Sequence, residues 1–160
     1  MMIQRVANAL RQAHITIATA ESCTGGLLGA ALTQERGSSE YYLGGVISYA
    51  NAAKERLLGV EGEILRLEGA VSAAVAGKMA VGIQRKLRAA LGVATTGIAG
   101  PDGGSAEKPV GLVYIGLAGP DGVETRKFQF CGDRESIRQQ TVQAALHWVL
   151  LYLEQRKGEH

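Results

Sequence analysis

The sequence predicts a single α/β domain spanning residues 1–160, a three-layer α/β/α sandwich with a mixed β-sheet between two layers of helices. Segments with apolar residues at helical spacing alternate with short runs rich in Val, Ile and Tyr. The last two such runs flank a turn signal, so antiparallel strands join parallel ones in the sheet. The chain has 160 residues, 46% of them hydrophobic, which suits one core.

The first third of the chain predicts two helices and two strands. Residues 3–10 carry apolar side chains at the spacing of one helix face, so an amphipathic helix opens the chain. A buried strand over 15–20 follows, and a second helix carries apolar residues over 27–32. After a break at 37–39, residues 42–50 have the composition of a strand.

The middle of the chain predicts three helices before the next strand. Short helices are expected over 52–58 and 61–67, with Gly59 ending the first. Ser72 is placed to cap a longer helix that carries apolar residues up to position 87. Residues 91–96 then form the third predicted strand.

The last third predicts a β-hairpin and a long helix. Runs over 110–118 and 123–130 flank a Gly-Pro-Asp-Gly turn, in which proline presets φ and glycine accepts a positive one. Asp133 is placed to cap a terminal helix with apolar positions from Ile137 to Tyr152.

Composition argues against several classes of function. The 17 basic and 15 acidic residues are interspersed and give a net charge of +2, so no nucleic-acid partner is expected. No apolar stretch reaches the roughly 20 residues of a membrane span, and the N-terminus lacks a signal-peptide core, so a cytoplasmic protein without membrane contact is expected. Two cysteines without a CxxC motif indicate no metal site, and Cys131 is expected to be a small buried thiol.

Polar clusters stand at the ends of three predicted strands, at 21–24, 49–54 and 96–108. In open α/β sheets, ligands bind beyond the carboxyl ends of the strands, where neighbouring loops meet. The sequence therefore predicts that the three clusters share one pocket.

The first cluster, Glu21-Ser22-Cys23-Thr24-Gly25-Gly26, is a strand-to-helix turn. Backbone N–H groups at a helix start are unpaired and suit an anion, whether a phosphate or a transient oxyanion. The alternative is that Ser22 or Thr24 only caps the helix and that the glycines only turn the chain.

Ser22 needs a base if it is a nucleophile, and no histidine is well placed. His14, His147 and His160 lie in no recognisable motif, so Lys54 is the candidate base, provided that burial lowers its pKa. Tyr49 can relay a proton or orient the serine, because a phenol hydroxyl both donates and accepts. The alternatives are a solvated lysine and a tyrosine at the sheet edge.

The segment 96–109 contains four glycines and two prolines in fourteen positions. It matches neither the P-loop nor the dinucleotide-binding pattern. Its backbone suits phosphate, with Thr96, Ser105 and Lys108 or Arg138 as further donors. The alternative is an ordered surface loop without a ligand.

Six segments together resemble the CinA C-terminal domain family, the nicotinamide-nucleotide amidohydrolases. They are Ala20-Glu21-Ser22-Cys23-Thr24-Gly25-Gly26, Tyr49-Ala50-Asn51-Ala52-Ala53-Lys54, Gly69-Ala70-Val71-Ser72, Thr96-Gly97-Ile98-Ala99-Gly100-Pro101-Asp102-Gly103-Gly104, Lys108-Pro109-Val110-Gly111 and Gly132-Asp133-Arg134. The resemblance covers nearly the whole chain. Larger family members carry an additional N-terminal domain, so this chain resembles the stand-alone form.

The resemblance implies deamidation of nicotinamide mononucleotide in pyridine nucleotide salvage, without metal or cofactor, by a homodimer. It implies Ser22 as the nucleophile, activated by Lys54 and Tyr49. Backbone N–H groups around 24–26 are expected to hold the oxyanion. The residues expected to bind the substrate are Glu21, Thr24, Gly25, Gly26, Asn51, Thr96, Gly97, Ala99, Gly100, Gly103, Gly104, Lys108 and Arg138.

Two alternatives to this function stay open. One is a catalytically silent nucleotide-binding or regulatory module that retains the pocket. The other is a cysteine amidase of free nicotinamide, in which Cys23 rather than Ser22 faces the substrate. Adjacent residues of a turn point in different directions, so only one of the two side chains is expected to act.

Overall fold

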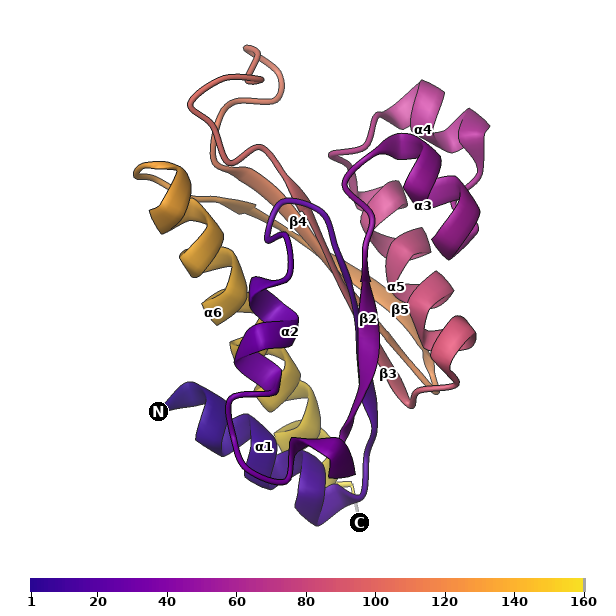
Figure 1. Ribbon diagram of the computed structural model, residues 1–160, viewed down its shortest axis with the longest axis vertical. Coiled ribbons are helices and arrows are strands. Elements are labelled where there is room, and N and C mark those ends of the chain that lie inside the picture. The colour runs from indigo at the N-terminus through magenta and orange to yellow at the C-terminus, as the bar shows by residue number, and fades with distance from the viewer. Residues whose placement is uncertain (160) are drawn as a thin grey trace.

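The computed structural model describes residues 1–159 and has the predicted three-layer arrangement (Figure 1). A five-stranded mixed sheet of order β2-β1-β3-β4-β5 lies between two layers of helices. The elements in chain order are α1 (Met2–Ala13), β1 (Ile17–Glu21), α2 (Leu27–Leu32), the 3₁₀ turn η1 (Ser38–Glu40), β2 (Tyr42–Ile47), α3 (Asn51–Leu58), α4 (Gly62–Glu68), α5 (Ala73–Leu87), β3 (Leu91–Gly97), β4 (Leu112–Gly119), β5 (Gly122–Gln129) and α6 (Arg134–Lys157).

The direction of the strands determines which loops meet. β1 pairs in parallel with both β2 and β3, so these three strands end at the same edge of the sheet. β4 runs antiparallel to β3, and β5 antiparallel to β4, which confirms the predicted hairpin. The loops after β1, β2 and β3 therefore lie together at one end of the molecule, the upper end in Figure 1.

Each face of the sheet is covered by its own set of helices (Figure 1). Helices α1, α2 and α6 pack on one face around a core that includes Leu10, Leu28 and Trp148. Helices α3, α4 and α5 cover the other face, where Met79 and Ile83 of α5 are fully buried. The apolar stripes read from the sequence point into these two cores.

The predicted caps are also confirmed. The Ser72 hydroxyl accepts from the Val75 N–H at 3.2 Å, and the Asp133 carboxylate accepts from the Ser136 N–H at 2.8 Å. Gly59 ends α3 in the left-handed conformation with φ of 69°. These local signals were sufficient to place the ends of helices because each cap satisfies an otherwise unpaired backbone group.

Three features differ from the sequence-based expectations. β1 is shifted and runs to Glu21, and β2 stops at Ile47, which frees the following residues to form a connection to α3. Cys131 is exposed rather than buried, because it lies in the loop between β5 and α6.

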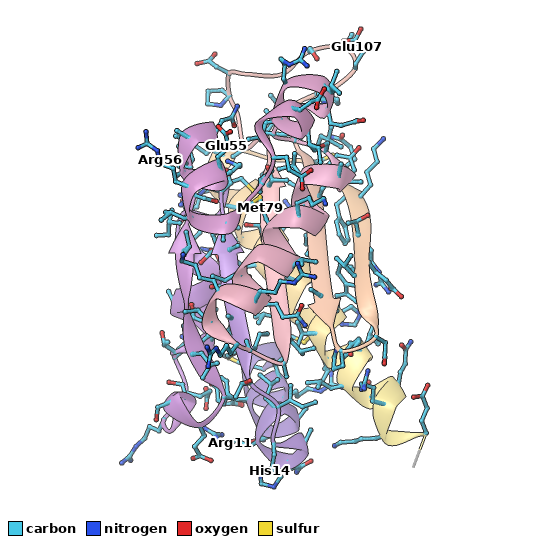
Figure 2. All side chains as sticks on the ribbon, turned by 90° about the vertical axis from the view of Figure 1, so that its right-hand side faces the viewer. Arg11, His14, Glu55, Arg56, Met79 and Glu107 are labelled. Carbon is cyan, nitrogen blue, oxygen red and sulfur yellow. The ribbon has the colours of Figure 1, made fainter. Side chains whose placement is uncertain are left out.

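Figure 2 shows Glu107 at the tip of the glycine-rich loop, at the opposite end of the molecule from Arg11 and His14. Within residues 1–159, no helix is long and apolar enough to cross a membrane.

Candidate active site

The three polar clusters do share one cavity, as predicted. The cavity has a volume of about 190 Å³ and lies beyond the ends of β1, β2 and β3. Its walls are formed by Ser22, Cys23, Tyr49, Lys54, Ala70, Val71, Thr96, Gly97, Ala99 and Arg134.

Ser22 and Lys54 form the centre of this cavity. The Lys54 Nζ lies 3.1 Å from the Ser22 Oγ, and the two residues are 1% and 8% exposed, respectively. Lys54 is on the first turn of α3, and its side chain reaches back across the connection from β2. Burial lowers the pKa of the Lys54 ammonium below its ordinary value. A buried lysine with a lowered pKa beside a serine is a candidate base for a candidate nucleophile.

The other partners of Lys54 determine which way its proton moves. Its Nζ also donates to the Ser48 carbonyl at 2.7 Å and to the Tyr49 carbonyl at 3.2 Å. Carbonyl oxygens only accept, so these two contacts retain an N–H whether the amine is charged or neutral. The remaining tetrahedral position faces the Ser22 hydroxyl. When Lys54 is neutral, its lone pair therefore points at the serine proton.

Glu21 does not lie in the cavity wall, in contrast to its predicted role in substrate binding. Its buried carboxylate sits under the start of α2, where Oε1 accepts from the N–H groups of Gly26 and Leu28 at 3.2 and 2.8 Å. Oε2 accepts from the Gly29 N–H at 3.0 Å. The start of this helix is thus already occupied by an anion of the protein itself.

Two of the backbone N–H groups expected to hold an oxyanion are engaged within the protein. Gly26 N–H donates to Glu21, and Gly25 N–H donates to the Ser22 carbonyl at 3.1 Å. In the part of the chain that the structure describes, the backbone N–H groups of Cys23 and Thr24 donate no hydrogen bond to another residue. The unpaired donors of the turn are therefore the N–H groups of Cys23 and Thr24, of which only Thr24 belongs to the expected set.

Arg138 and Thr24 hold the turn in place. Arg138 donates from Nε to the Cys23 carbonyl and from Nη2 to the Thr24 carbonyl, each at 3.1 Å. The fully buried Thr24 hydroxyl lies 2.5 Å from Glu21 Oε1 and 2.8 Å from Thr95 Oγ1. Gly25 has φ of 56°, and a Cβ there would lie 3.0 Å from the Arg138 guanidinium. These residues shape the turn and are not part of the cavity wall.

Tyr49 stands at the mouth of the cavity rather than beside Ser22. Its side chain is 64% exposed, and its hydroxyl accepts from Arg134 Nη2 at 3.2 Å. Arg134 also donates from Nη1 to the Gly100 carbonyl at 2.8 Å. One guanidinium thus joins the loop after β2 to the loop after β3.

The glycine-rich segment contributes its beginning to the cavity, and the rest extends away. Gly97 and Ala99 line the cavity, and the Thr96 hydroxyl donates to the Ala70 carbonyl at 2.8 Å. Lys108 donates from Nζ to the Glu68 carbonyl at 2.6 Å, outside the cavity wall. The residues of the predicted set that the structure does not bring to the wall are Glu21, Thr24, Gly25, Gly26, Asn51, Gly100, Gly103, Gly104, Lys108 and Arg138.

Cys23 lines the cavity but has the properties of a core residue. Its thiol is buried among apolar side chains, and burial raises its pKa to about 11. A thiol with raised pKa is protonated near neutral pH and is a weak nucleophile. Of the two adjacent candidates, only Ser22 has a base within hydrogen-bond distance.

Sequence reasoning gave no site role to Arg134, Ala70 or Val71. All three belong to segments that carry the family resemblance, Gly132-Asp133-Arg134 and Gly69-Ala70-Val71-Ser72, and this was the available signal. Within residues 1–159, no group of three or more His, Cys, Asp or Glu side chains is arranged to hold a metal ion.

Comparisons with known proteins agree on one family. The family model described as the CinA C-terminal domain matches residues 1–153. A putative competence-damage inducible protein of Moorella thermoacetica is 52% identical over 134 residues, which are 84% of this chain and 32% of the relative. A CinA-like protein of Citrifermentans bemidjiense is 46% identical over 98% of this chain and 38% of the relative. The chain thus spans about a third of the length of these curated relatives.

Solved structures show the same fold over almost the full chain. A competence/damage inducible protein from Agrobacterium tumefaciens superposes with a TM-score of 0.91 at 42% identity, covering 96% of this chain and 93% of that one. A CinA superfamily protein from Klebsiella pneumoniae gives 0.93 at 35% identity, covering 96% of each chain.

Proposed function

This chain belongs to the CinA C-terminal domain family, and we propose that it is an amidohydrolase that converts nicotinamide mononucleotide to nicotinic acid mononucleotide and ammonia. The substrate comes from the family resemblance. The observation that carries the proposed chemistry is the buried pair of Ser22 and Lys54, 3.1 Å apart, at the wall of a cavity beyond the strand ends.

In the first step, neutral Lys54 removes the hydroxyl proton of Ser22 as Oγ attacks the amide carbon of the substrate. The carbon–oxygen bond forms, and the carbonyl electrons move to oxygen to give a tetrahedral oxyanion. The backbone N–H groups of Cys23 and Thr24 are the unpaired donors beside the nucleophile, so we place the oxyanion there.

In the second step, the carbon–nitrogen bond breaks and the Lys54 ammonium gives its proton to the departing nitrogen, so ammonia leaves. Ser22 is left as an ester of the pyridine carboxylate. Water then repeats the sequence, losing a proton to Lys54 as its oxygen attacks the ester. Collapse of this second tetrahedral intermediate returns the proton to Ser22 Oγ and releases nicotinic acid mononucleotide.

Tyr49 has two parts with different roles in this proposal. Its carbonyl helps to aim Lys54 at the serine, and its hydroxyl is held at the mouth of the cavity by Arg134. Proton transfer through the phenol requires a change of side-chain position on substrate binding. We therefore expect the Tyr49→Phe variant to lose much less activity than a variant without Ser22.

The test is ammonia release from nicotinamide mononucleotide by metal-stripped protein, run beside Ser22→Ala. The parent should be active, and the variant should lose about a thousandfold or more, as expected for loss of a nucleophile. Hydroxylamine in the same assay should capture the ester as a pyridine hydroxamate with the parent and not with the variant.

A folded parent that releases no ammonia would contradict the proposal. In that case, a measurement of mononucleotide binding distinguishes a silent binding module from a protein with another substrate. Activity that survives Ser22→Ala and is lost in Cys23→Ala would support the cysteine amidase instead.

A further inference from the structure

The cavity encloses only part of a mononucleotide. Its volume of about 190 Å³ is below the roughly 300–1,000 Å³ of pockets that bury a whole small-molecule ligand. With the carboxamide at Ser22, the rest of the substrate must extend through the mouth of the cavity. The groups that recognise the phosphate are therefore expected at or beyond this mouth.

Two cations that the sequence predicts for phosphate are engaged elsewhere. Both nitrogen contacts of Arg138 hold carbonyls of the nucleophile turn, and the residue is not part of the cavity wall. Lys108 Nζ is bound to the Glu68 carbonyl beyond the wall. What separates these two side chains from the cavity is their position, since neither is part of its wall.

Arg134 is differently placed. It lies in the cavity wall, its side chain is exposed to solvent, and it reaches across the mouth to Tyr49 and Gly100. These two hydrogen bonds use two of the five guanidinium N–H groups, so three donors are left. Among residues 1–159, no carboxylate forms an ion pair with Arg134, so its charge is not neutralised by the protein.

The backbone around Arg134 adds to its suitability for an anion. Arg134 is the first residue of α6, whose start is fixed by the Asp133 cap. The positive end of this 24-residue helix lies at the same point. The guanidinium is also held by the Gly100 carbonyl, which limits its freedom and so reduces the entropy lost when a ligand binds.

We propose that Arg134 forms the phosphate subsite of this enzyme and selects phosphorylated amides over the corresponding nucleosides, which lack the phosphate. This inference rests on the proposed function and adds to it the residue that reads the charged end of the substrate. Arginine is suited to this because its planar donors bind two phosphate oxygens at once.

The experiment compares two substrates that differ only in the phosphate, nicotinamide mononucleotide and nicotinamide riboside. kcat/KM is measured for both with the parent, Arg134→Gln and Arg134→Lys. We expect Arg134→Gln to lose about 10- to 100-fold on the mononucleotide, as for loss of a charge-assisted hydrogen bond, and to change little on the riboside. Arg134→Lys should recover part of this loss, because it retains charge but not two-point contact.

Two control variants test whether the preference for the phosphorylated substrate depends on Arg134 rather than on another cation. Arg66→Gln removes an exposed arginine whose ion pair is with Glu63, so it should leave the preference unchanged. Lys108→Gln tests the competing cation in the glycine-rich loop. A phosphate-selective loss in Lys108→Gln with none in Arg134→Gln would overturn the proposal.

A loss of equal size on both substrates in Arg134→Gln would also overturn it, because Arg134 would then act by positioning Tyr49 and the loop. Calorimetric binding of both compounds separates this inference from the proposed function. If the parent releases no ammonia yet binds the mononucleotide more tightly than the riboside, and Arg134→Gln removes the difference, the subsite stands and the proposed catalysis does not. If binding shows no preference in the parent, the subsite is wrong whatever the activity.

Discussion

Two buried ionisable side chains flank Ser22, the proposed nucleophile, and their surroundings differ. Glu21 is 2% exposed and Lys54 is 1% exposed, and within the described chain no ion pair joins them. The Glu21 carboxylate accepts from three backbone N–H groups and one hydroxyl. Lys54 donates to two carbonyls and to the hydroxyl of Ser22.

The difference suits two roles within one small region, a structural role for Glu21 and a role in the proposed reaction for Lys54. The backbone partners of Glu21 can only donate, so its side-chain oxygens hold the turn that carries Ser22. One partner of Lys54 can both donate and accept, so the proton between them can move in either direction. Glu21 is not part of the cavity wall, which suits a structural role, whereas Lys54 lines the cavity beside Ser22, which suits the proposed role of a base.

The largest expected effect is a loss of activity when Lys54 or Ser22 is replaced. Lys54→Met and Ser22→Ala should each reduce kcat for deamidation by about a thousandfold or more, and the double variant should be no worse than either single one, because the two residues act as a unit. The measurement is ammonia release at saturating substrate. Losses that multiply in the double variant would show that the two side chains act independently.

The next largest effect is a loss of stability when Glu21 is replaced. Glu21→Ala removes the acceptor of three backbone N–H groups and of the Thr24 hydroxyl, and it should reduce the free energy of unfolding by about 3 kcal/mol or more, measured by urea denaturation. Glu21→Gln should lose less, since one oxygen is retained. Glu61→Gln, which removes an exposed ion pair with Lys78, is the control and should change stability by less than about 1 kcal/mol. A stable Glu21→Ala protein would contradict the structural role.

The pH dependence of kcat/KM tests the proposed role of Lys54 as the base. Burial lowers the pKa of Lys54 from its ordinary 10.5. In the proposed mechanism, the neutral amine is the form that acts as base. Below that lowered pKa, kcat/KM should rise about tenfold per pH unit and then level off before pH 10.5. A profile that falls with rising pH over this range would exclude Lys54 as the base.

The same shift affects stability in a predictable direction. Between the lowered pKa and 10.5, the unfolded chain binds more protons at Lys54 than the folded chain does. The free energy of unfolding therefore gains a contribution that increases with pH across this interval. Lys54→Met should lack this contribution, which urea denaturation at several pH values detects by difference.

The smallest expected effect concerns the neighbouring thiol. Cys23→Ala should retain most of the activity, because a protonated, buried thiol beside the serine is neither base nor nucleophile. Iodoacetamide at pH 8 should label the exposed Cys131 and leave Cys23 unmodified, as read by mass spectrometry. Loss of activity in Cys23→Ala on the scale of Ser22→Ala would reverse the assignment of the nucleophile.

Local patterns in the sequence were enough to predict most of the fold. Ser72 and Asp133 marked the starts of α5 and α6, and the Pro-Asp-Gly turn marked the hairpin between β4 and β5. Strand order was not predictable, because it depends on which apolar faces pack together across distant parts of the chain. The exposed position of Cys131 was missed because local composition does not report what covers a loop.

For the candidate site, too, the sequence predicted some features and the tertiary structure decided others. The sequence by itself determined that Ser22, Tyr49 and Lys54 stand in polar segments at strand ends, and the cavity contains all three. Only the tertiary structure decided that Glu21 fills the start of α2, that Arg138 holds the turn from behind, and that Arg134 lies at the cavity mouth. Residues 100 or more apart meet there, as the Arg138 side chain and the Cys23 carbonyl do, and hydrogen-bond partners at such separation are fixed by packing rather than by sequence spacing.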